Sequence, residues 1–522
     1  MEPGVEIELK ALSRQKPMND IIDRGDSIVQ QFYSGVTVFV TGGSGFVGKQ
    51  LIEKLFRSCA IRKMYLLMRP KKKTAIHERL HQILKDPVFN LVYEKNPHFA
   101  DKIEPVEGDV AKIRLGINDK QWGQLTEEVN VIFHVAATTK FNAPLRDATF
   151  TNVVGTREAL ALARECSKLK SFVHVSTAFS HATKDRAGKE FLEQFYPSPM
   201  APNTLIQLAK NVDEERLNGI TEGLLNGWAN TYTFTKAVAE ELIRIDAGDL
   251  PICIVRPPVV APAYCEPAPG WLDVSAVFGP SGFLLGPILG VLHLFLADKD
   301  LKLSVTPIDI VNNITIMAPW DAAERRRNGE ANIPVYNATN KNCYVTVGLV
   351  CDTLIASRHK LCSPKAVWHC SAIATKNDIL YRILALFLHY IPAYLLDKVL
   401  DILGKKPENI KSFVKLYKKI DDCFWVYKLF FFNAWDFKND NVTKMISRMS
   451  DSDQAIFNCD LTAFDREEFI RIWGVGLRKY IIKDGLTGDR AAAKWQPSAR
   501  VLSIPAYTTM TFRGSFEYVA GG

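Results

Sequence analysis

The clearest pattern in the first two thirds of the chain is a series of short apolar runs separated by stretches with helical periodicity. The runs lie at residues 36–40, 63–68, 129–137, 171–178 and 251–258. They are nearly continuous rather than alternating and are rich in β-branched residues, which is typical of strands that are buried on both faces. Helical stretches between them, such as residues 46–57 and 143–168, complete βαβ units. The pattern therefore predicts an α/β fold built on a doubly wound parallel sheet.

The strand pattern fades after about residue 340, where helical, aromatic-rich sequence takes over. We therefore predict a leader over residues 1–32, an α/β domain over 33–340, a linker over 341–374, a smaller, mainly α-helical domain over 375–484 and a tail over 485–522. The N-terminal residues show no apolar core of a secretory signal, and the ten cysteines are scattered without a CxxC pair. We expect reduced thiols on the cytosolic side and no metal site.

Composition and charge exclude several classes of protein. The chain is 47% hydrophobic and 23% charged, which is ordinary for a globular protein and excludes a disordered or collagen-like chain. Lys and Arg number 65 and Asp and Glu 57, which gives a formal net charge of +8. An excess this small is compatible with an anionic ligand or membrane surface but does not indicate a nucleic-acid binder.

Two apolar segments raise the question of membrane contact. Residues 274–297 carry no formal charge and are long enough to span a bilayer, but glycines and prolines interrupt them repeatedly. We interpret this segment as a mobile apolar wall of a substrate site, with a spanning helix as the alternative. Residues 383–396 are shorter and include His389 and Pro392, which suits a buried or interfacial helix better than a span.

A glycine-rich turn directly follows the first predicted strand. Gly42, Gly45 and Gly48 have the spacing GxxGxxG within TGGSGFVG, which also contains Ser44 and Phe46. The first glycine allows a tight turn, the second lets backbone N–H groups approach a pyrophosphate, and the third lets helix and strand pack closely. The N-terminus of the following helix adds partial positive charge. Because strand, glycines and amphipathic helix come in the required order, the loop predicts a dinucleotide site rather than an ordinary turn.

The end of the second predicted strand distinguishes between the two nicotinamide cofactors. An acidic residue there would bind a ribose 2′-hydroxyl, whereas arginine accommodates a 2′-phosphate. The sequence has Arg69, then Pro70 and the lysines 71–73, which favours NADPH; a solvated charge run is the alternative. Asp109 and Val110, after a third apolar stretch, are candidate contacts to the adenine, and Asp109 could equally cap a turn.

Tyr232 and Lys236 form a YxxxK pair in a segment with helical sequence. Residues four apart share a helix face, so the ammonium can lie beside both the phenol and a cofactor ribose. A nearby cation favours the phenolate, so we expect Lys236 to lower the pKa of Tyr232 and make it an acid and base near neutral pH. Tyr394 and Lys398 repeat the spacing, but only the first pair follows a glycine-rich loop and a strand that ends in hydroxyl side chains.

This combination resembles the extended short-chain dehydrogenase/reductase family. The resemblance implies that a hydroxyl after the fifth strand positions the substrate carbonyl, that the tyrosine donates a proton and that the lysine anchors the cofactor ribose. Matching VHVSTA to the family pattern gives the hydroxyl role to Thr177, with Ser176 as the second choice. It also implies that Ala136 lies beneath the adenosine and that Pro257 lines the nicotinamide. Thr177 and Tyr232 lie 55 positions apart, a gap that an insertion must fill, so contact between these two side chains is an inference.

More of the chain resembles alcohol-forming fatty acyl-CoA reductases, in which an NADPH-binding Rossmann domain precedes a smaller helical domain. The matching stretches span roughly residues 35–480 and include TGGSGFVG, HVSTAFS, NTYTFTKAVAE, IVRPPVV, GWLD, TPIDIVNN and FNCDLTAFDREEFIRIWGVGLRKY. The resemblance implies NADPH-dependent reduction of long-chain acyl-CoA to a primary alcohol through an aldehyde, with Thr177, Tyr232 and Lys236 as catalytic residues. A related dehydrogenase acting on a steroid or sugar nucleotide, and a non-catalytic nucleotide-binding scaffold at a lipid surface, are the alternatives.

Several features concern partners. Lysines and aromatic residues alternate in one C-terminal segment that could meet CoA phosphates or anionic headgroups, with a solvated helix face as the alternative: Lys405, Lys406, Lys411, Phe413, Lys415, Tyr417, Lys418, Lys419, Phe424 and Trp425. We expect peripheral contact with a cytosol-facing membrane of the endoplasmic reticulum or peroxisome, or with a lipid droplet, and leave a homodimer open. Asp309 is expected to order a loop or domain junction rather than to act as an acid or base.

Overall fold

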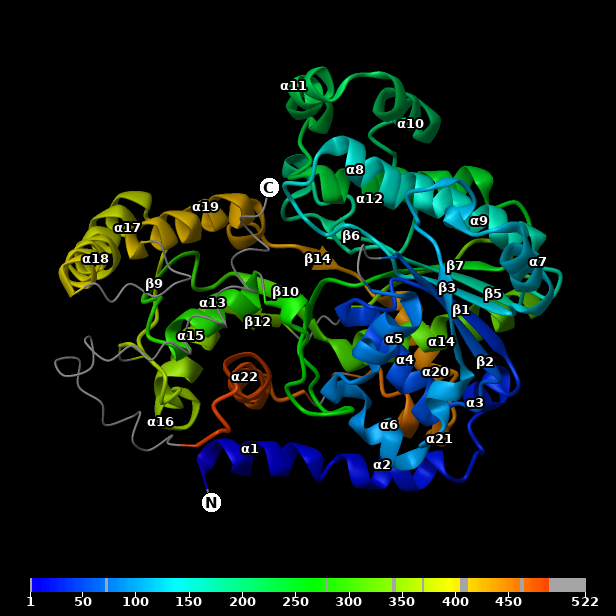
Figure 1. The fold of residues 1–522 in the computed structure, drawn as a ribbon, viewed down its shortest axis with the longest axis horizontal. Coiled ribbons are helices and arrows are strands. Elements are labelled where there is room, and N and C mark those ends of the chain that lie inside the picture. The colour runs from blue at the N-terminus through cyan, green and yellow to red at the C-terminus, as the bar shows by residue number, and fades with distance from the viewer. Residues whose placement is uncertain are drawn as a thin grey trace.

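The computed structural model describes residues 2–70, 74–277, 279–339, 344–368, 370–403, 412–460 and 464–487. Its largest element is a seven-stranded sheet with the order β11-β7-β5-β4-β1-β2-β3, in which every neighbouring pair is parallel (Figure 1). The strands are β1 (Thr37–Thr41), β2 (Lys63–Met68), β3 (Ile103–Glu107), β4 (Val131–His134), β5 (Ser171–Val175), β7 (Ile252–Arg256) and β11 (Val335–Asn337). The predicted doubly wound parallel sheet is therefore confirmed.

The five apolar runs of the sequence contain the five central strands, which are buried at nearly every position. The two edge strands give weaker sequence signals than the five central ones, and the sequence indicates β3 only as the apolar stretch before Asp109. In β3 the sequence IEPVE mixes charged residues and a proline with apolar ones, as an edge position permits. The strand β11 has only three residues, which is too short to give a periodic signal.

Helices cover both faces of the sheet, which explains why the strands have no polar face. On one face lie α4 (Phe46–Ser58) and α14 (Ile308–Arg327), and on the other lie α7 (Asp119–Glu128), α9 (Gly155–Glu165) and α12 (Thr231–Asp246). The helix predicted over residues 143–168 is divided into α8 (Leu145–Thr149), the π-helical turn η4 (Phe150–Val154) and α9. Two apolar cores result, one on each face of the sheet.

The segment predicted as a leader, residues 1–32, instead folds into α1 (Pro3–Leu12), α2 (Gln15–Ile22) and α3 (Ile28–Tyr33). These helices lie against the C-terminal helices (Figure 1), where Arg14 pairs with Glu468 and Ser27 donates to Asp453. These helices have only 6 to 10 residues each, which is too short for a clear periodic pattern, and their packing partners lie more than 400 residues away in the sequence.

The region after the sheet is helical, as predicted, but it begins earlier than the sequence indicated. Part of the segment predicted as a linker forms β12 (Tyr344–Thr346), α15 (Val347–Ala356) and α16 (Arg358–Leu361). The helices that follow are α17 (Asp378–Ala385), η7 (Leu386–Tyr390), α18 (Ile391–Leu403), α19 (Phe413–Phe431), α20 (Asp440–Ser447), α21 (Asp451–Ile456), α22 (Arg466–Gly476) and η8 (Leu477–Ile482). The predicted tail lies outside the described residues after Thr487.

Small sheets join the C-terminal region to the α/β domain. In the first, β8 (Val259–Ala261), β10 (Lys302–Pro307) and β12 are neighbours; in the second, β9 (Leu294–Leu296) pairs with β13 (Ile373–Thr375). In the third, β6 (Glu190–Phe191) pairs with β14 (Asp436–Phe437), so the insertion between Thr177 and Tyr232 contacts the C-terminal region directly. The α/β domain and the C-terminal region are therefore in contact next to the segment that links Thr177 to Tyr232.

Candidate active site

The glycine loop has the geometry that a dinucleotide requires. Gly42 has φ +76°, and a Cβ there would lie 2.6 Å from the backbone nitrogen of Ala136, so any other residue would clash with the end of β4. A Cβ on Gly48 would lie 2.4 Å from the carbonyl oxygen of Gly42, which shows that strand and helix pack closely there. Gly45 is the N-cap of α4, and Ser44 before it is exposed. The backbone N–H groups at this helix start are thus open to a pyrophosphate.

Two guanidinium groups converge at the end of β2. Arg69 directly follows the strand and is exposed, and Arg79 on α5 (Ile76–Leu84) donates a hydrogen bond to the Arg69 carbonyl. Burial and the nearby charge of Arg69 lower the pKa of Arg79, so the two positive charges lie close enough to interact. Sequence analysis missed Arg79 because nothing local marks it. The lysines at 71–73 lie outside the described residues.

The predicted adenine contacts, Asp109 and Val110, follow β3 in a tight turn. The Asp109 carboxylate accepts a hydrogen bond from the Ala111 amide at 3.0 Å, which is the turn-capping role that the sequence left open. The Val110 carbonyl packs against Gly155 of α9, where a Cβ would lie 3.0 Å away. Both residues therefore lie at the carboxyl edge of the sheet, next to the end of β2.

Thr177 and Tyr232 are brought together despite the insertion between them. Thr177 lies two residues beyond β5, and Tyr232 is in the first turn of α12, which begins at its N-cap Asn230. Their hydroxyl groups lie close enough for Thr177 to act on the pKa of Tyr232. The Thr177 hydroxyl donates to the carbonyl oxygen of Pro257 at 3.4 Å, so the segment expected to line the nicotinamide touches the same hydroxyl.

The electrostatics of the pair differ from the sequence-based expectation. Burial raises the pKa of Tyr232 to about 12, and the Thr177 hydroxyl is the neighbour that acts to lower it. The expectation that Lys236 lowers this pKa is therefore wrong. The Lys236 ammonium points at β5 instead, where it donates to the Val175 carbonyl at 2.7 Å. Burial lowers the pKa of Lys236 to about 8, opposed by the charge of Glu240.

A row of aromatic rings leads away from Tyr232 toward the C-terminal region. The ring of Phe141 stacks on that of Tyr232 with centroids 6.1 Å apart, and Tyr427 of α19 lies 5.2 Å from Phe141. The next ring, Phe283, is 6.1 Å from Tyr427 and stacks on Phe424 at 4.7 Å. The catalytic candidates are thus connected to the C-terminal region by a continuous aromatic wall.

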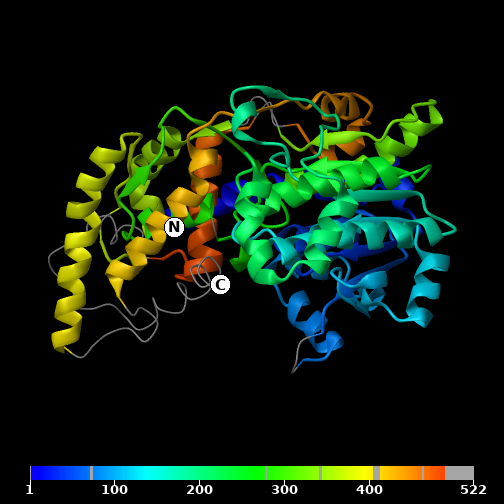
Figure 2. The same cartoon turned by 90° about the horizontal axis from the view of Figure 1, so that it is seen from above.

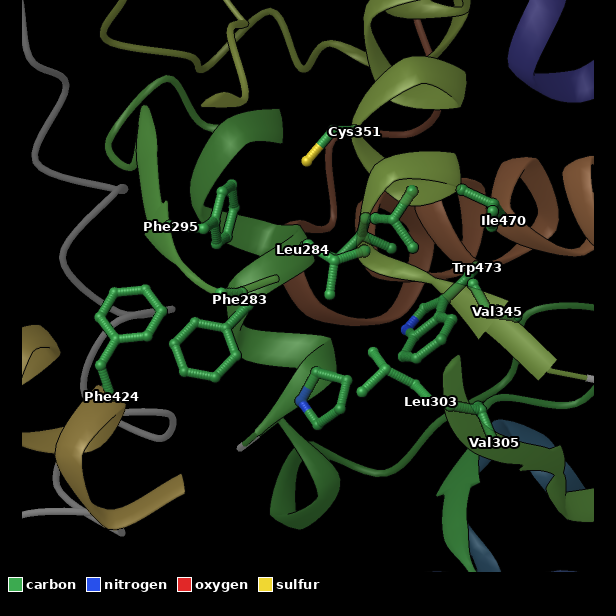
Figure 3. Close-up of a pocket in the computed structure, with 14 residues that line it drawn as sticks. Phe283, Leu284, Phe295, Leu303, Val305, Val345, Cys351, Phe424, Ile470 and Trp473 are labelled. Atoms are coloured by element: carbon green, nitrogen blue, oxygen red, sulfur yellow. The ribbon is translucent and has the colours of Figure 1, made fainter. Parts of the chain in front are cut away.

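The wall ends at an apolar cavity between the two regions. Its lining residues have aliphatic or aromatic side chains, apart from the thiol of Cys351. Figure 3 shows Phe283 of α13 (Pro280–Ile288) and Phe424 of α19 on one side of it and Trp473 of α22 on the other. The segment 274–297 contributes Phe283 and a residue of β9 to the lining and contains a nine-residue helix and a short strand rather than one spanning helix. Its interpretation as a mobile wall of a substrate site stays a prediction.

Asp309 has the structural role that the sequence indicated. It lies in the first turn of α14, and its carboxylate accepts hydrogen bonds from the backbone amides of Tyr264, Cys265 and Glu266 at 3.1, 2.8 and 3.1 Å. A buried carboxylate that binds three backbone amides fixes the loop to which they belong. This loop lies between β8 and GWLD, and Asp309 ties it to the start of α14.

One helix among the described residues is long and apolar enough to cross a membrane. It runs continuously over Asp378–Leu403, through α17, η7 and α18. Its most apolar 18-residue stretch has a mean hydropathy of 1.6, and only 22% of that stretch is buried inside the protein. The apolar segment 383–396 is its centre, so the helix is longer than the sequence analysis proposed. Figure 2 shows it at the edge of the molecule, outside α19. Ile379, Phe387 and Ile402 expose 72%, 62% and 83% of their surface.

Two family profiles described as male sterility protein match the chain. The first, for an NAD-binding domain, matches residues 40–315, and the second, named Sterile, matches residues 388–484. Among curated proteins, fatty acyl-CoA reductase wat of Drosophila melanogaster is 35% identical over 500 residues, which cover 94% of this chain and 92% of that protein. Human fatty acyl-CoA reductase 1 is 32% identical over 468 residues, covering 89% and 88%.

Solved structures share the fold at lower identity. The terminal R domain of the myxalamid pathway aligns with a TM-score of 0.57 at 18% identity, over 85% of this chain and 91% of that one. The reductase domain of a Mycobacterium tuberculosis non-ribosomal peptide synthetase gives 0.52 at 18%, over 90% and 99%. Together with the sequence matches, they show an oxidoreductase with a nicotinamide-binding Rossmann domain, and the chain belongs to the fatty acyl-CoA reductase family.

Proposed function

We propose that the protein reduces long-chain fatty acyl-CoA to the primary alcohol in two NADPH-dependent steps through an aldehyde. The observation that carries the proposal is the aromatic wall from Tyr232 to the apolar cavity. It joins a pair of hydroxyl donors to a space without charged side chains, which matches a thioester carried on a long hydrocarbon chain. Each buried methylene contributes about 0.8 kcal/mol, so a long chain binds far better there than a short one.

The cofactor residues divide along the carboxyl edge of the sheet. The amides around Gly45 would bind the pyrophosphate, and Arg69 and Arg79 would bind the 2′-phosphate that distinguishes NADPH from NADH. An ammonium has three N–H donors, so Lys236 can bind a ribose hydroxyl in addition to the Val175 carbonyl. A bound NADPH would supply the hydride.

In the first step, the Thr177 hydroxyl turns from the Pro257 carbonyl to the substrate, and the Thr177 and Tyr232 hydroxyls donate hydrogen bonds to the thioester carbonyl oxygen. As hydride adds to the carbonyl carbon, negative charge develops on this oxygen, and donors that are already in place stabilise it more than water would. The raised pKa of Tyr232 keeps the phenol protonated at neutral pH, so it remains a donor. Collapse of the tetrahedral oxyanion breaks the C–S bond, releases CoA thiolate and leaves the aldehyde.

In the second step, the aldehyde oxygen occupies the position that the thioester oxygen had. After a second hydride adds to the carbon, Tyr232 transfers its proton to the alkoxide, because an alkoxide is far more basic than a phenolate. Solvent then returns a proton to the phenolate. The same hydroxyl pair therefore serves an oxyanion that must collapse and an alkoxide that must be protonated.

The test is to incubate the purified protein with NADPH and palmitoyl-CoA and to identify the products by mass spectrometry. We expect hexadecanol, with two NADPH consumed for each alcohol. Parallel reactions contain a 3-hydroxysteroid or a nucleotide sugar with the appropriate cofactor. Turnover of one of these without turnover of acyl-CoAs of any length would contradict the proposal, and no turnover of any substrate would favour the scaffold alternative.

We also propose that the exposed face of the helix Asp378–Leu403 rests on a lipid surface on the cytosolic side. A row of large apolar side chains in water is unfavourable unless a partner covers it. The neighbouring α19 exposes Lys415, Lys418 and Lys419, whose charge suits anionic headgroups. Among the aromatic residues predicted to face the lipid, Trp425 is 46% exposed.

The other three aromatic residues of α19 that the sequence analysis assigned to an interface do not face the proposed lipid surface. Phe413, Tyr417 and Phe424 are buried against the protein because they point to the opposite side of the helix, so their predicted interfacial role is wrong. Lys405, Lys406 and Lys411 lie outside the described residues. The lipid contact therefore depends on the helix Asp378–Leu403 and on the exposed side of α19.

A further inference from the structure

A buried ion pair lies directly behind the hydroxyl donors and has no role in the steps above. Glu240 on α12 and Arg256 at the end of β7 are 1% and 3% exposed. Arg256 binds the carboxylate through two nitrogens, with Nη2–Oε2 at 2.6 Å and Nε–Oε1 at 3.0 Å. Bidentate geometry of this kind fixes direction as well as distance.

Glu240 connects the two elements that carry the hydroxyl donors. It lies one turn after Lys236 and two turns after Tyr232 on the same face of α12. Its Oε1 accepts hydrogen bonds from the hydroxyl of Ser176 at 2.5 Å and of Ser180 at 3.1 Å. Since Ser176 directly precedes Thr177, the carboxylate holds the end of β5 against the helix that presents the phenol.

Arg256 connects the remaining two parts of the site. It directly precedes Pro257, whose carbonyl accepts from the Thr177 hydroxyl. Its Nη2 donates to the carbonyl of Gln194 at 2.9 Å and its Nη1 to that of Leu192 at 3.4 Å. Both carbonyls belong to the insertion between Thr177 and Tyr232, so the guanidinium anchors the insertion to the segment expected to line the nicotinamide.

We infer that the Glu240–Arg256 pair is a positioning unit, which sets the relation of the two hydroxyl donors and holds a carboxylate one helical turn from the Lys236 ammonium. A pair with a purely stabilising role could be replaced by apolar residues at little cost, because desolvating two ions offsets most of their attraction. Here the pair forms four further hydrogen bonds to segments that border the site. The inference uses the proposed function for one of its two readouts.

The second part of the inference follows from the charges around the pair. The titratable and charged groups near Lys236 and Glu240 are His134 on β4, His174 on β5, His181 after β5, Tyr232 on α12 and Arg256 on β7. Burial and the Lys236 charge lower the pKa of His134 to about 3 and also lower that of His174 well below its usual value, so both are neutral at pH 7. Glu240 is the group that raises the pKa of Lys236.

The test compares Glu240→Gln with Glu241→Gln, a neighbouring glutamate that pairs with the surface residue Arg244. Gln keeps the shape of Glu240 but loses its charge. At pH 7 we expect kcat with palmitoyl-CoA to fall roughly tenfold or more in Glu240→Gln, as the loss of charged hydrogen bonds suggests. As pH rises, the activity of Glu240→Gln should also begin to decline at a lower pH than that of the wild type, because Lys236 loses its proton earlier. Glu241→Gln should change neither.

The second readout is the pH dependence of NADPH affinity, followed by fluorescence, which requires no knowledge of the substrate. If Lys236 binds the ribose as an ammonium, affinity weakens as pH rises through its pKa, and this weakening should move to lower pH in Glu240→Gln. The readout therefore remains valid even if the enzyme proves to act on another substrate.

A folded Glu240→Gln protein with wild-type kcat and unchanged pH profiles would overturn the inference. So would a loss of kcat that only reflects fewer folded molecules, with both profiles unmoved. If Glu240→Gln does not fold, Ser176→Ala removes one contact of the carboxylate without burying an unpaired charge. It should lower kcat with little change in NADPH affinity at pH 6, and wild-type kcat in this variant would equally overturn the inference.

Discussion

The chain contains the YxxxK spacing twice, and the two copies lie in opposite environments. At Tyr232 and Lys236 the lysine is 1% exposed and donates to the end of β5, and the phenol meets the Thr177 hydroxyl. At Tyr394 and Lys398 the tyrosine is 56% exposed, and the ammonium lies 5.6 Å above the ring of that same tyrosine. The spacing places two side chains on one helix face, but the surroundings decide whether they can do chemistry.

The difference teaches which condition is decisive. Only the first pair is excluded from water and has a third polar group from another element, which a proton donor needs in order to act on a carbonyl. The second pair belongs to the exposed apolar helix, where a tyrosine with one polar and one apolar end suits a membrane interface. Identical local sequence signals thus serve a reaction in one region and a surface in the other.

The largest effect should come from removing the phenol of the first pair, with the phenol of the second pair as the comparison. Tyr232→Phe removes the proton donor, so we expect kcat to fall by roughly 10²–10⁴-fold, with NADPH affinity nearly unchanged. Tyr394→Phe, the matched control, should keep wild-type turnover. Steady-state kinetics and NADPH fluorescence measure both quantities. Wild-type turnover in Tyr232→Phe would refute its assignment as the donor.

A somewhat smaller loss of activity is expected from removing the Thr177 hydroxyl, which lies beside the first pair. Thr177→Val keeps the shape of the side chain but removes the hydroxyl, and losing one donor to a developing oxyanion costs roughly 10²–10³-fold in kcat. Thr177→Ser keeps the hydroxyl and should retain most of the activity. If Thr177→Val were as active as Thr177→Ser, the hydroxyl would have no part in stabilising the oxyanion.

Removing the two arginines at the proposed cofactor site should change the KM for NADPH roughly tenfold to hundredfold. The double change Arg69→Ala and Arg79→Ala removes two charged donors, so the KM for NADPH should rise roughly 10- to 100-fold while that for NADH stays the same. Arg62, exposed just before the opposite end of β2, is the matched control. An equal rise for both cofactors would show that the arginines do not read the 2′-phosphate.

The smallest effect on turnover is expected at the helix that carries the second pair. Phe387→Glu with Ile402→Glu should abolish sedimentation with anionic phospholipid vesicles but change activity toward soluble substrate less than twofold. Ile113→Glu is the control, since Ile113 is 77% exposed in another part of the surface. Vesicle binding that survives the double change, or is lost equally in the control, would contradict the lipid contact.

Sequence patterns predicted those features that depend on neighbours along the chain. The glycine spacing, the strand β2 and the hydroxyls after β5 each have a local physical cause, such as a clash at Gly42 or burial on both faces. The contact of Thr177 with Tyr232 could only be inferred, because the fold has to return the chain across a long insertion before the hydroxyls meet.

Features that join distant segments gave no local signal. Arg79 reaches Arg69 from a separate helix, and the Glu240–Arg256 pair is visible only once α12 lies against the end of β7. The cavity combines residues from α13 to α22, so no single stretch of sequence outlines it. The pKa of Tyr232 was predicted in the wrong direction because burial, which the motif does not encode, raises it, while the ammonium of Lys236 is directed at the Val175 carbonyl.

The most direct test of the central claim is to follow the hydrogen that is transferred. Palmitoyl-CoA is incubated with NADPH that carries deuterium at the transferable position of the nicotinamide, and the alcohol is analysed by mass spectrometry. Our account predicts hexadecanol with two deuterium atoms, both on C1, and almost no labelled alcohol with Tyr232→Phe. An alcohol without deuterium on C1, or full labelling by the variant, would contradict it.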